Sequence, residues 1–438
     1  MSAGDGTVAP VPVGETGVVD AGIDLDQIPA EERARLPKPP ENRFTAALIQ
    51  IRDGGALITV LAVVIALVVG AVLIAVTDAG TQTAAVYFFA RPTDTLAAAW
   101  NAIAGAYAAL FQGGVYDYTA PTFFQGLQSL GHAVGFATPL IAAGLGIAVG
   151  FRSGVFNIGG QGQVLMGAAF AGYVGFTWDG PPVITMLVAV AFGMLGGGLL
   201  AGLVGVLKAR TGANEVIVTI MLNYIVFYLL DYALQTPFLR APGSTNPISP
   251  SEHASAVFFP ILPPEYKVNF GFLLVLAATV FCSWLLSRSS IGFKMRAVGE
   301  NQRAARVAGI EVNRVVVAAM VVSGVLVGLA GVDQVLGTTT TGFTSGIDAG
   351  IGFNAITVTL LGRSRPWGVF WAGILFGVFQ AGGYTMQAAQ SVDINAVQIV
   401  QSVIVLFIAA PPLVRAIFRL PQPGARRKPS RRGKAVAA

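Results

Sequence analysis

Long apolar runs without a charged residue recur through this chain, and they constrain its fold more than any other feature. A helix needs about 20 apolar residues to cross the hydrocarbon core of a bilayer, and residues 56–76 reach that length. Charged residues make up 11% of the 438 residues, against about 25% in a typical soluble domain. Because lipid offers no partner to backbone polar groups, such runs fold as helices. We therefore predict an all-α, polytopic helical membrane protein.

We predict about ten transmembrane segments, including broken or re-entrant helices. They lie at roughly 56–76, 133–150, 164–176, 183–207, 216–234, 270–286, 315–336, 351–361, 369–386 and 396–414. The chain then consists of a disordered acidic extension at 1–53, a transmembrane domain at 54–414 and a basic tail at 415–438. An Ala-rich stretch at 96–111 fits an interfacial helix or an extra crossing.

The basic residues orient these segments, because Lys and Arg accumulate in cytoplasmic loops. With this number of crossings, only Arg91, Arg240 and Lys267 of the 27 basic residues fall outside the cell. We therefore predict a multi-pass protein of the cell membrane with both termini cytoplasmic. The proline-rich segment 235–269 becomes an irregular external loop, which is either a docking surface for an extracytoplasmic partner or a plain connector.

Glycine pairs at four-residue spacing predict tight contacts between the helices. Apolar side chains gain little over lipid by touching each other, so membrane helices associate through small residues that let the backbones approach. The pairs are Gly131/Gly135, Gly193/Gly197, Gly198/Gly202, Gly324/Gly328 and Gly373/Gly377.

Several kinds of chemistry are absent from the sequence. There is one cysteine, Cys282, and the two histidines, His132 and His253, are far apart. The chain also lacks the glycine-rich phosphate loop of ATPases and any HExxH motif. We therefore expect no catalytic residue, no metal and no cofactor in this chain, and no ATP hydrolysis of its own.

The most informative stretch is 154–163, GVFNIGGQGQ, which places Asn157, Gln161 and Gln163 among glycines just before an apolar run. Glycine weakens a helix by about 1 kcal/mol relative to alanine, so the backbone here is predicted to be broken or re-entrant. Such backbone occurs at membrane depth where protein buries it or where it lines a wet cavity. The amides are then candidates for a substrate pathway; the alternative is a cytoplasmic turn with capping side chains.

A second interruption, at 338–354, contains Asn354 and precedes another short apolar run. Paired broken segments in two halves of a transporter often mark its substrate route. Asn223, inside a predicted span, should face the bundle interior. We therefore add Asn223 and Asn354 to the predicted pathway.

The cytoplasmic loop at 288–314 is the longest connection predicted inside the cell. Within it, residues 300–308 are predicted to form a short helix, with Glu300 in its first turn, Arg303 and Arg306 near its end and Gly309 as the stop. A short charged helix is suited to receive force from another subunit. With Arg296, these residues are predicted to form the contact with such a subunit; a loop without a partner is the alternative.

These segments resemble the permeases of ABC importers for branched-chain amino acids, simple sugars and nucleosides, most closely the nucleoside subgroup. The subgroup pattern GLFNIGxEGQ resembles GVFNIGGQGQ at 154–163, where Gln161 replaces its usual glutamate and Val155 its leucine. ANEVIVTIMLNY at 213–224, with Glu215, Thr219 and Asn223, resembles a second family segment. GFKMRAVGENQRAARVAGI at 292–310 resembles the cytoplasmic coupling segment that docks on the ATPase.

The resemblance implies import of nucleosides, with ATP used by a partner subunit. It also implies three partners: a cytoplasmic ABC ATPase, a second homologous permease that forms a heterodimer, and an extracytoplasmic substrate-binding lipoprotein. Membrane lipid surrounds the chain, and no nucleic acid is expected.

Other functions stay open at this point. The same architecture serves importers of simple sugars or branched-chain amino acids. A self-sufficient, ion-coupled secondary transporter is suggested by Glu215, Asp231 and Asp333 as coupling acids. A membrane-embedded enzyme is disfavoured, because no nucleophile has a base nearby in the sequence.

Overall fold

The computed structural model describes residues 55–390, 398–399, 402–403 and 406. The chain divides into two units, Met1–Val60 with Pro421–Ala438, and Leu61–Leu420. Only the start of one helix is described in the first unit, and all the other described elements belong to the second. The predicted extension at 1–53, the predicted tail at 415–438 and most of the predicted span at 396–414 fall outside the described residues.

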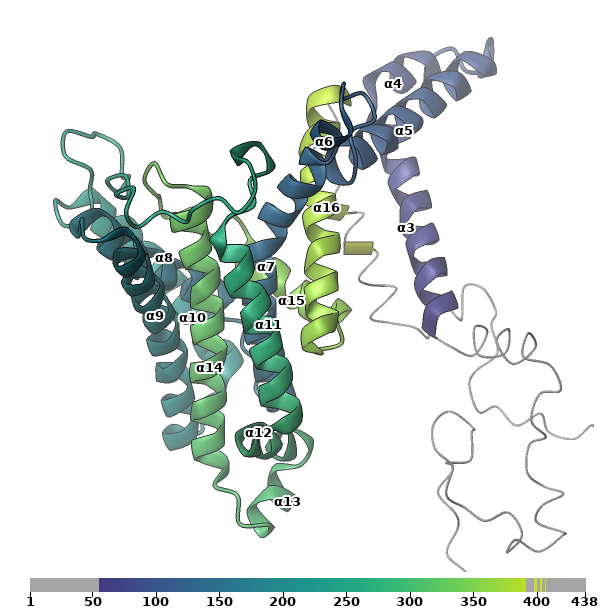
Figure 1. The fold of residues 1–438 in the computed structure, drawn as a ribbon. Helices are drawn as coiled ribbons and strands as arrows, with labels where there is room; N and C mark the ends of the chain where they lie inside the picture. The colour runs from purple at the N-terminus through teal and green to yellow at the C-terminus, as the bar shows by residue number, and fades with distance from the viewer. Residues whose placement is uncertain (1–54, 391–397, 400–401, 404–405, 407–438) are drawn as a thin grey trace, which may run out of the picture. The chain divides into compact units, whose positions relative to one another are not determined.

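Every regular element of the described ranges is a helix, apart from an isolated antiparallel bridge between Pro260 and Asn269 (Figure 1). This confirms the all-α prediction. The elements are α3 (Gly55–Thr77), α4 (Ala79–Ala85), α5 (Pro92–Gly114), α6 (Phe123–Gly126), α7 (Gln128–Arg152), α8 (Gly160–Thr177), α9 (Pro182–Thr211), α10 (Glu215–Gln235), η2 (Pro264–Tyr266), α11 (Phe270–Arg288), α12 (Ser290–Glu300), α13 (Gln302–Val307), α14 (Val312–Asp333), η3 (Gln334–Thr338), α15 (Ile351–Leu361) and α16 (Pro366–Gln390).

Six described helices are long and apolar enough to cross a membrane, namely α7, α9, α10, α11, α14 and α16. The second half of α3 and α4, bent by 69° relative to each other, form a seventh crossing if they are taken together. Helix α8 covers a predicted span, but the two glutamines in its first turn lower its hydropathy, and α15 has only 11 residues. The nine predicted spans between 56 and 386 therefore lie on helices, whereas the total of ten full crossings is not confirmed. The Ala-rich stretch at 96–111 is part of α5, which falls short of the apolar character of a spanning helix.

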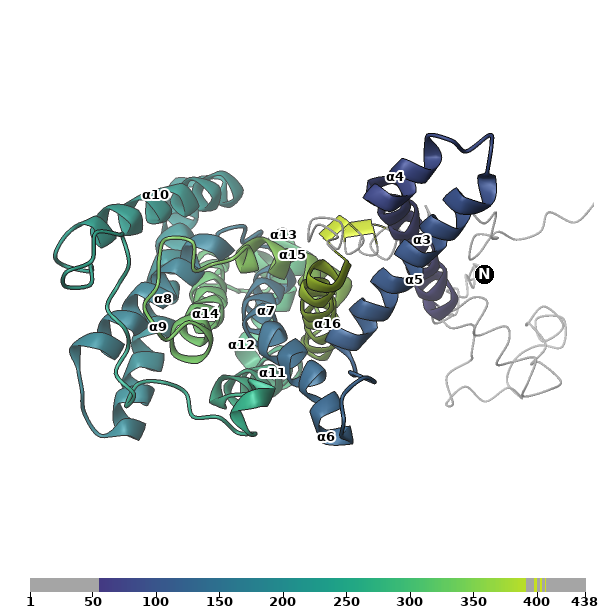
Figure 2. The ribbon, with the colours of Figure 1, turned by 90° about the horizontal axis from the view of Figure 1, so that it is seen from above.

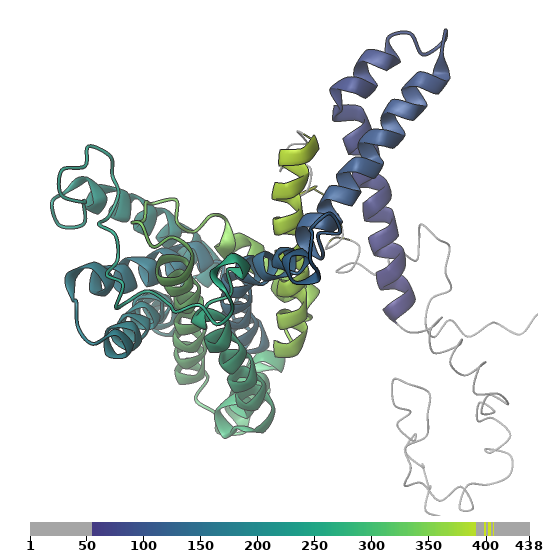
Figure 3. The same cartoon turned by 45° about the horizontal axis from the view of Figure 1, so that its top comes forward.

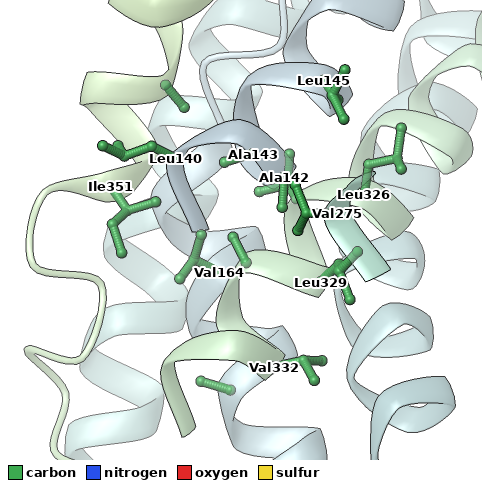
Figure 4. Packing of buried hydrophobic residues seen from close by; sticks show 14 of the residues in the cluster. Leu140, Ala142, Ala143, Leu145, Val164, Val275, Leu326, Leu329, Val332 and Ile351 are labelled. Carbon is green, nitrogen blue, oxygen red and sulfur yellow. The ribbon is translucent and has the colours of Figure 1, made fainter. Parts of the chain in front are cut away.

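Helix α7 forms the centre of the bundle. In its most apolar stretch 78% of the residues are buried, against 22% in α10. Figure 4 shows Leu140 and Leu145 of α7 in one cluster with Val164 of α8 and Leu329 of α14. Looking down the helices, Figure 2 shows α10 at the edge of the bundle, beyond α8.

Two of the predicted glycine pairs lie face to face between α9 and α14. A methyl group added at Gly197 would lie 2.4 Å from the carbonyl oxygen of Gly324 and 2.7 Å from the Cα atom of Gly328. Gly193 lies against α14 as well, because a methyl group added at Gly193 would lie 2.3 Å from the side chain of Val332. Because no side chain separates the backbones at Gly197, Gly324 and Gly328, α9 and α14 pack closely there.

Helix α16 packs between α7 and α5 (Figure 3). On one side, Gly373 lies against Ile141 of α7 and Gly377 against the carbonyl oxygen of Ala133. On the other side, Phe379 and Met386 join a small core with Ala106 and Ala109 of α5. Glycine contacts thus fix α16 to the central helix as they fix α9 to α14.

Candidate functional site

The segment at 154–163 begins as a non-helical turn between α7 and α8. Helix α7 ends at Arg152, and Gly154 has a φ of 71°, a backbone conformation that glycine adopts without strain. The chain stays irregular until α8 begins at Gly160. The prediction of a broken backbone is confirmed for 154–159 and wrong for 160–163, which form the first turn of α8 because glutamine is a good helix former.

Asn157 is the centre of a closed hydrogen-bond network inside this turn. Its amide nitrogen donates to Oε1 of Gln163 (2.9 Å) and to Oγ of Ser323 (2.8 Å). Its Oδ1 accepts from Nε2 of Gln163 (2.9 Å) and from the backbone N–H of Gly159 (3.0 Å). Asn157, Gln163 and Ser323 have no exposed surface. These amides therefore bond to each other in this conformation.

The network lies deep in the bundle. Ser323 is near the middle of α14. Because Asn157 bonds to it, the turn that follows α7 reaches the level of the centre of α14. Asn223 of α10 holds the other side of the turn: its Oδ1 accepts from the backbone N–H of Gly162 (2.9 Å) and its Nδ2 donates to the carbonyl of Ile158 (3.0 Å). Helices α8, α10 and α14 are thus joined by buried side-chain hydrogen bonds.

The second predicted interruption meets the first in space. The chain is irregular from Thr339 to Gly350, which has a φ of 79°, and α15 then begins at Ile351. A methyl group added at Gly352 would lie 2.2 Å from the backbone nitrogen of Gln161. The starts of the short helices α8 and α15 are therefore in direct contact.

Gln161 and Asn354 belong to the first turns of these two helices, and both side chains are partly exposed. They differ in this from Asn157, Gln163 and Asn223, which are buried. Of the five amides predicted to form a pathway, these two are the ones that are not buried in this conformation. The role of all five as a pathway stays a prediction.

The predicted coupling helix at 300–308 is wrong in its boundaries. Glu300 is the last residue of α12, and Asn301 then adopts an extended backbone and caps α13. The side chain of Asn301 accepts from the backbone N–H groups of Arg303 and Ala304, both at 3.0 Å. Asparagine is among the best N-caps, which glutamate is not. Gly309 does end this helix, with a φ of 79°.

The predicted coupling residues lie at one end of the bundle. Glu300, Arg303 and Arg306 are exposed, whereas Arg296 is half-buried and its Nε has no partner among the described residues. Beside α13, a cavity of about 340 Å³ separates it from the connection between α9 and α10. Its lining includes Gln302 and Arg306 of this loop and the ion pair of Lys208 with Glu215.

Helix α12 touches the turn that carries the amide network. A methyl group added at Gly299 would lie 2.2 Å from the carbonyl oxygen of Arg152 and 3.0 Å from the backbone nitrogen of Gly154. Val155 continues the contact, since it packs in one core cluster with Val298 of α12. The surface helix and the buried turn are thus in backbone contact.

The three acids proposed for ion coupling have different surroundings. Glu215 pairs with Lys208 at the end of the bundle near α13. Asp231 accepts from Ser345 (3.0 Å) and Gln235 (2.9 Å). Asp333 is buried at the end of α14, and its Oδ1 has no partner among the described residues. Nothing in this arrangement joins them into one ion path.

The predicted external loop is irregular, as expected, and covers the far end of α8. Glu252 is buried there, with its backbone N–H donating to the carbonyl of Thr340 (3.4 Å). Neither carboxylate oxygen has a partner in the part of the chain that the structure describes. Burial therefore raises the pKa of Glu252 to about 7.

Two residues of the site were not singled out from the sequence. Ser323 anchors the amide network, and Gly299 forms the contact of α12 with the turn. Ser323 could have been predicted, because it directly precedes the Gly324/Gly328 pair. A small polar residue beside a close contact between helices is placed to form a hydrogen bond with a neighbouring helix or turn. No signal distinguished Gly299 from the other glycines.

Comparison with known proteins assigns the sequence that forms this site to a family. Residues 129–409 match the family described as branched-chain amino acid transport system / permease component. The guanosine ABC transporter permease protein NupP of Bacillus subtilis (strain 168) is 34% identical over 316 residues, which are 72% of this chain and 88% of that protein.

Two further relatives are similar over most of their length. The nucleoside ABC transporter permease protein NupB of Lactococcus lactis is 31% identical over 64% of this chain and 79% of its own. The glucose ABC transporter permease protein TsgB13 of Haloferax volcanii is 30% identical over 62% of this chain and 73% of its own. No solved structure matches the chain. The match over 129–409, which holds both interruptions and the α12–α13 loop, shows that this chain belongs to the family of ABC transporter permease components of the branched-chain amino acid type.

Proposed function

We propose that this chain is the permease subunit of an ATP-driven importer for nucleosides in the cell membrane. The proposal is supported by relatives named for guanosine and nucleosides, which are 34% and 31% identical to this chain. Import of a simple sugar is the second candidate, because a relative named for glucose is nearly as similar.

In this proposal the chain has no ATPase site and no cofactor of its own. A separate cytoplasmic ABC ATPase uses ATP and docks on α12 and α13 through Arg303 and Arg306. A second homologous permease completes the path, and an extracytoplasmic lipoprotein delivers the substrate. Both termini are cytoplasmic, and so is the end of the bundle that carries α12 and α13.

The observation that carries the proposal is the backbone contact of Gly299 with Arg152 and Gly154. Force applied to α12 reaches the turn directly, because no flexible side chain lies between the two backbones. The turn also holds the starts of α8 and, through Gly160 and Gly352, of α15. Movement of α12 is therefore transmitted to the place where Gln161 and Asn354 are accessible.

Uptake measurements in cells that carry the complete transporter test this proposal. Arg303→Glu combined with Arg306→Glu should abolish nucleoside uptake and co-purification of the ATPase while the chain still inserts in the membrane. Arg210→Glu is the matched control, since Arg210 is also an exposed basic residue at this end of the bundle and lies outside α13. Unchanged uptake by the double variant, or uptake that needs no ATP, would refute the proposal.

The orientation has its own test. In a chain with Cys282→Ala, a cysteine introduced by Arg303→Cys should react with a membrane-impermeant maleimide only after the cells are opened. Reaction in intact cells would place α13 outside and end the proposal.

A further inference from the structure

An aromatic cavity of about 630 Å³ lies between α8, α9 and α10, in the half of the bundle away from α12 and α13. Its size is typical of small-molecule sites, which span about 300–1,000 Å³. Five of its lining residues are aromatic: Phe170, Tyr173, Phe192, Tyr232 and Phe238. None of the five amides of the predicted pathway lines this cavity.

The lining selects for a flat, uncharged ligand. None of the described residues that line the cavity is charged, so the ammonium and carboxylate groups of an amino acid would be buried without partners. Side-chain hydroxyls come only from Tyr173, Tyr232 and Thr236, and that of Thr236 already donates to the carbonyl of Ala233 (2.7 Å). A simple sugar, with a hydroxyl on most of its carbons, would lose more hydrogen bonds with water than this cavity returns.

An aromatic ring, in contrast, finds partners in the cavity. The rings of Tyr173 and Phe238 are stacked, with centroids 5.5 Å apart and an interplanar angle of 26°. Phe238 belongs to the irregular loop after α10, so this stack joins that loop to helix α8. A ligand ring inserted beside this pair would extend the stack.

Three tyrosines continue from the cavity along α10. Tyr224, Tyr228 and Tyr232 are four residues apart on one helix face, and their exposed fractions are 59%, 66% and 67%. Tyrosine in a spanning helix is usually found at the membrane surfaces, whereas Tyr224 lies near the middle of α10. Three hydroxyls facing hydrocarbon would go unpaired, so this face is suited to a polar and aromatic route rather than to lipid.

We propose that the cavity of Phe170, Tyr173, Phe192, Tyr232 and Phe238 binds the base of the transported nucleoside as it enters the permease, and that Tyr228 and Tyr224 receive it next. This inference rests on the proposed function and sharpens it, because it favours nucleosides over sugars and amino acids. The ribose, which the cavity accommodates poorly, would point toward the open side of the cavity.

Photolabelling of the complete transporter tests the inference. Membranes of cells that carry all of its subunits are incubated with 8-azidoadenosine, illuminated and digested, and the labelled peptides are identified by mass spectrometry. Label should appear in 165–173 or 226–239, and excess adenosine should prevent it. Label elsewhere in the chain, or labelling of these peptides by a photoactivatable phosphatidylcholine that adenosine does not displace, would overturn it; the second result would make the cavity a lipid site.

Substitutions give an independent readout. Stacking of a base on an aromatic side chain contributes enough that Tyr173→Ala and Phe238→Ala should each lower nucleoside uptake about tenfold, while Tyr173→Phe keeps the ring and should stay within about twofold of the wild type. Trp284→Ala is the matched control, because Trp284 is an exposed aromatic residue of α11 outside the cavity.

The two proposals fail in different ways. If the wild-type transporter takes up no nucleoside, or does so without ATP, the proposed function is wrong. If the wild type takes up nucleosides and Tyr173→Ala and Phe238→Ala do so equally well, only the cavity is misassigned. Membrane insertion of each variant, measured by immunoblot, excludes loss of folding as the cause of a lower rate.

Discussion

Replacing Asn157 by leucine should destabilise the turn between α7 and α8, and the hydrogen bonds of Asn157 indicate how large the loss of stability should be. The substitution keeps the branching of the side chain but removes four hydrogen bonds, to Gln163 (two), Ser323 and Gly159. Side-chain hydrogen bonds between membrane helices contribute ~0.6 kcal/mol each on average, and a buried polar group left unpaired costs ~1–3 kcal/mol. We therefore expect Asn157→Leu to lower the free energy of unfolding by about 3 kcal/mol.

A double-mutant cycle with Gln163→Leu isolates the pair. Each single variant leaves the other amide buried without its partner, whereas the double variant leaves neither, so it should cost less than the two single effects together by about 1 kcal/mol or more. The assay is unfolding of the purified permease in mixed micelles with increasing SDS, followed by tryptophan fluorescence.

The control for this cycle is Gln161→Leu in the same segment. The side chain of Gln161 is partly exposed and makes no hydrogen bond to the described residues, so the substitution should change stability by less than about 0.5 kcal/mol. Additive effects of Asn157→Leu and Gln163→Leu, or effects no larger than the control, would refute the reasoning.

Three further predictions concern separate places in the fold. Gly197→Ala places a methyl group 2.4 Å from a carbonyl oxygen of α14, so the yield of monodisperse permease on size exclusion should fall, whereas Gly202→Ala meets only a valine side chain at 3.1 Å and should be tolerated; equal yields would contradict the packing. Gly299→Val should separate α12 from the turn, so nucleoside uptake drops while the ATPase still co-purifies; loss of both together would speak against transmission through this contact. Because burial raises the pKa of Glu252 from 4.5 to about 7, the folded protein binds a proton more tightly than the unfolded chain, and stability should fall as the pH rises between these values, by up to roughly 3 kcal/mol. Thermal unfolding across this range should show the decline in the wild type and a flatter profile in Glu252→Gln, and an identical decline in both would exclude Glu252 as its source.

The sequence predicted the helices and their interruptions well, because both depend on local composition. Apolar runs identify spanning helices, because lipid contains no water to bond with the backbone and the chain must pair its own polar groups. The density of glycine around Asn157 identified the broken backbone. The contact between Gly193/Gly197 and Gly324/Gly328 also follows from spacing, although the sequence does not say which pairs meet.

Properties that depend on distant partners could not be predicted in the same way. The burial of Asn157 follows from Ser323, more than 160 residues away in the chain. The boundary between α12 and α13 was misplaced because Glu300 suits the start of a helix electrostatically, while the hydrogen bonds of Asn301 decide where the helix begins. The aromatic cavity joins residues of three helices and a loop, and none of these segments predicts it alone.

The glycine contacts of α9 with α14 also indicate which part of the molecule moves. Backbones that touch have no rotamers to absorb a displacement, so α9, α14 and the central α7 should travel as one block. Helix α10 is attached to this block at Gly212, whose φ of 71° and uncrowded surroundings suit a hinge. A swing of α10 about Gly212 would have to break the hydrogen bonds of Asn223 with Gly162 and Ile158, so we expect these two bonds to limit how far α10 moves.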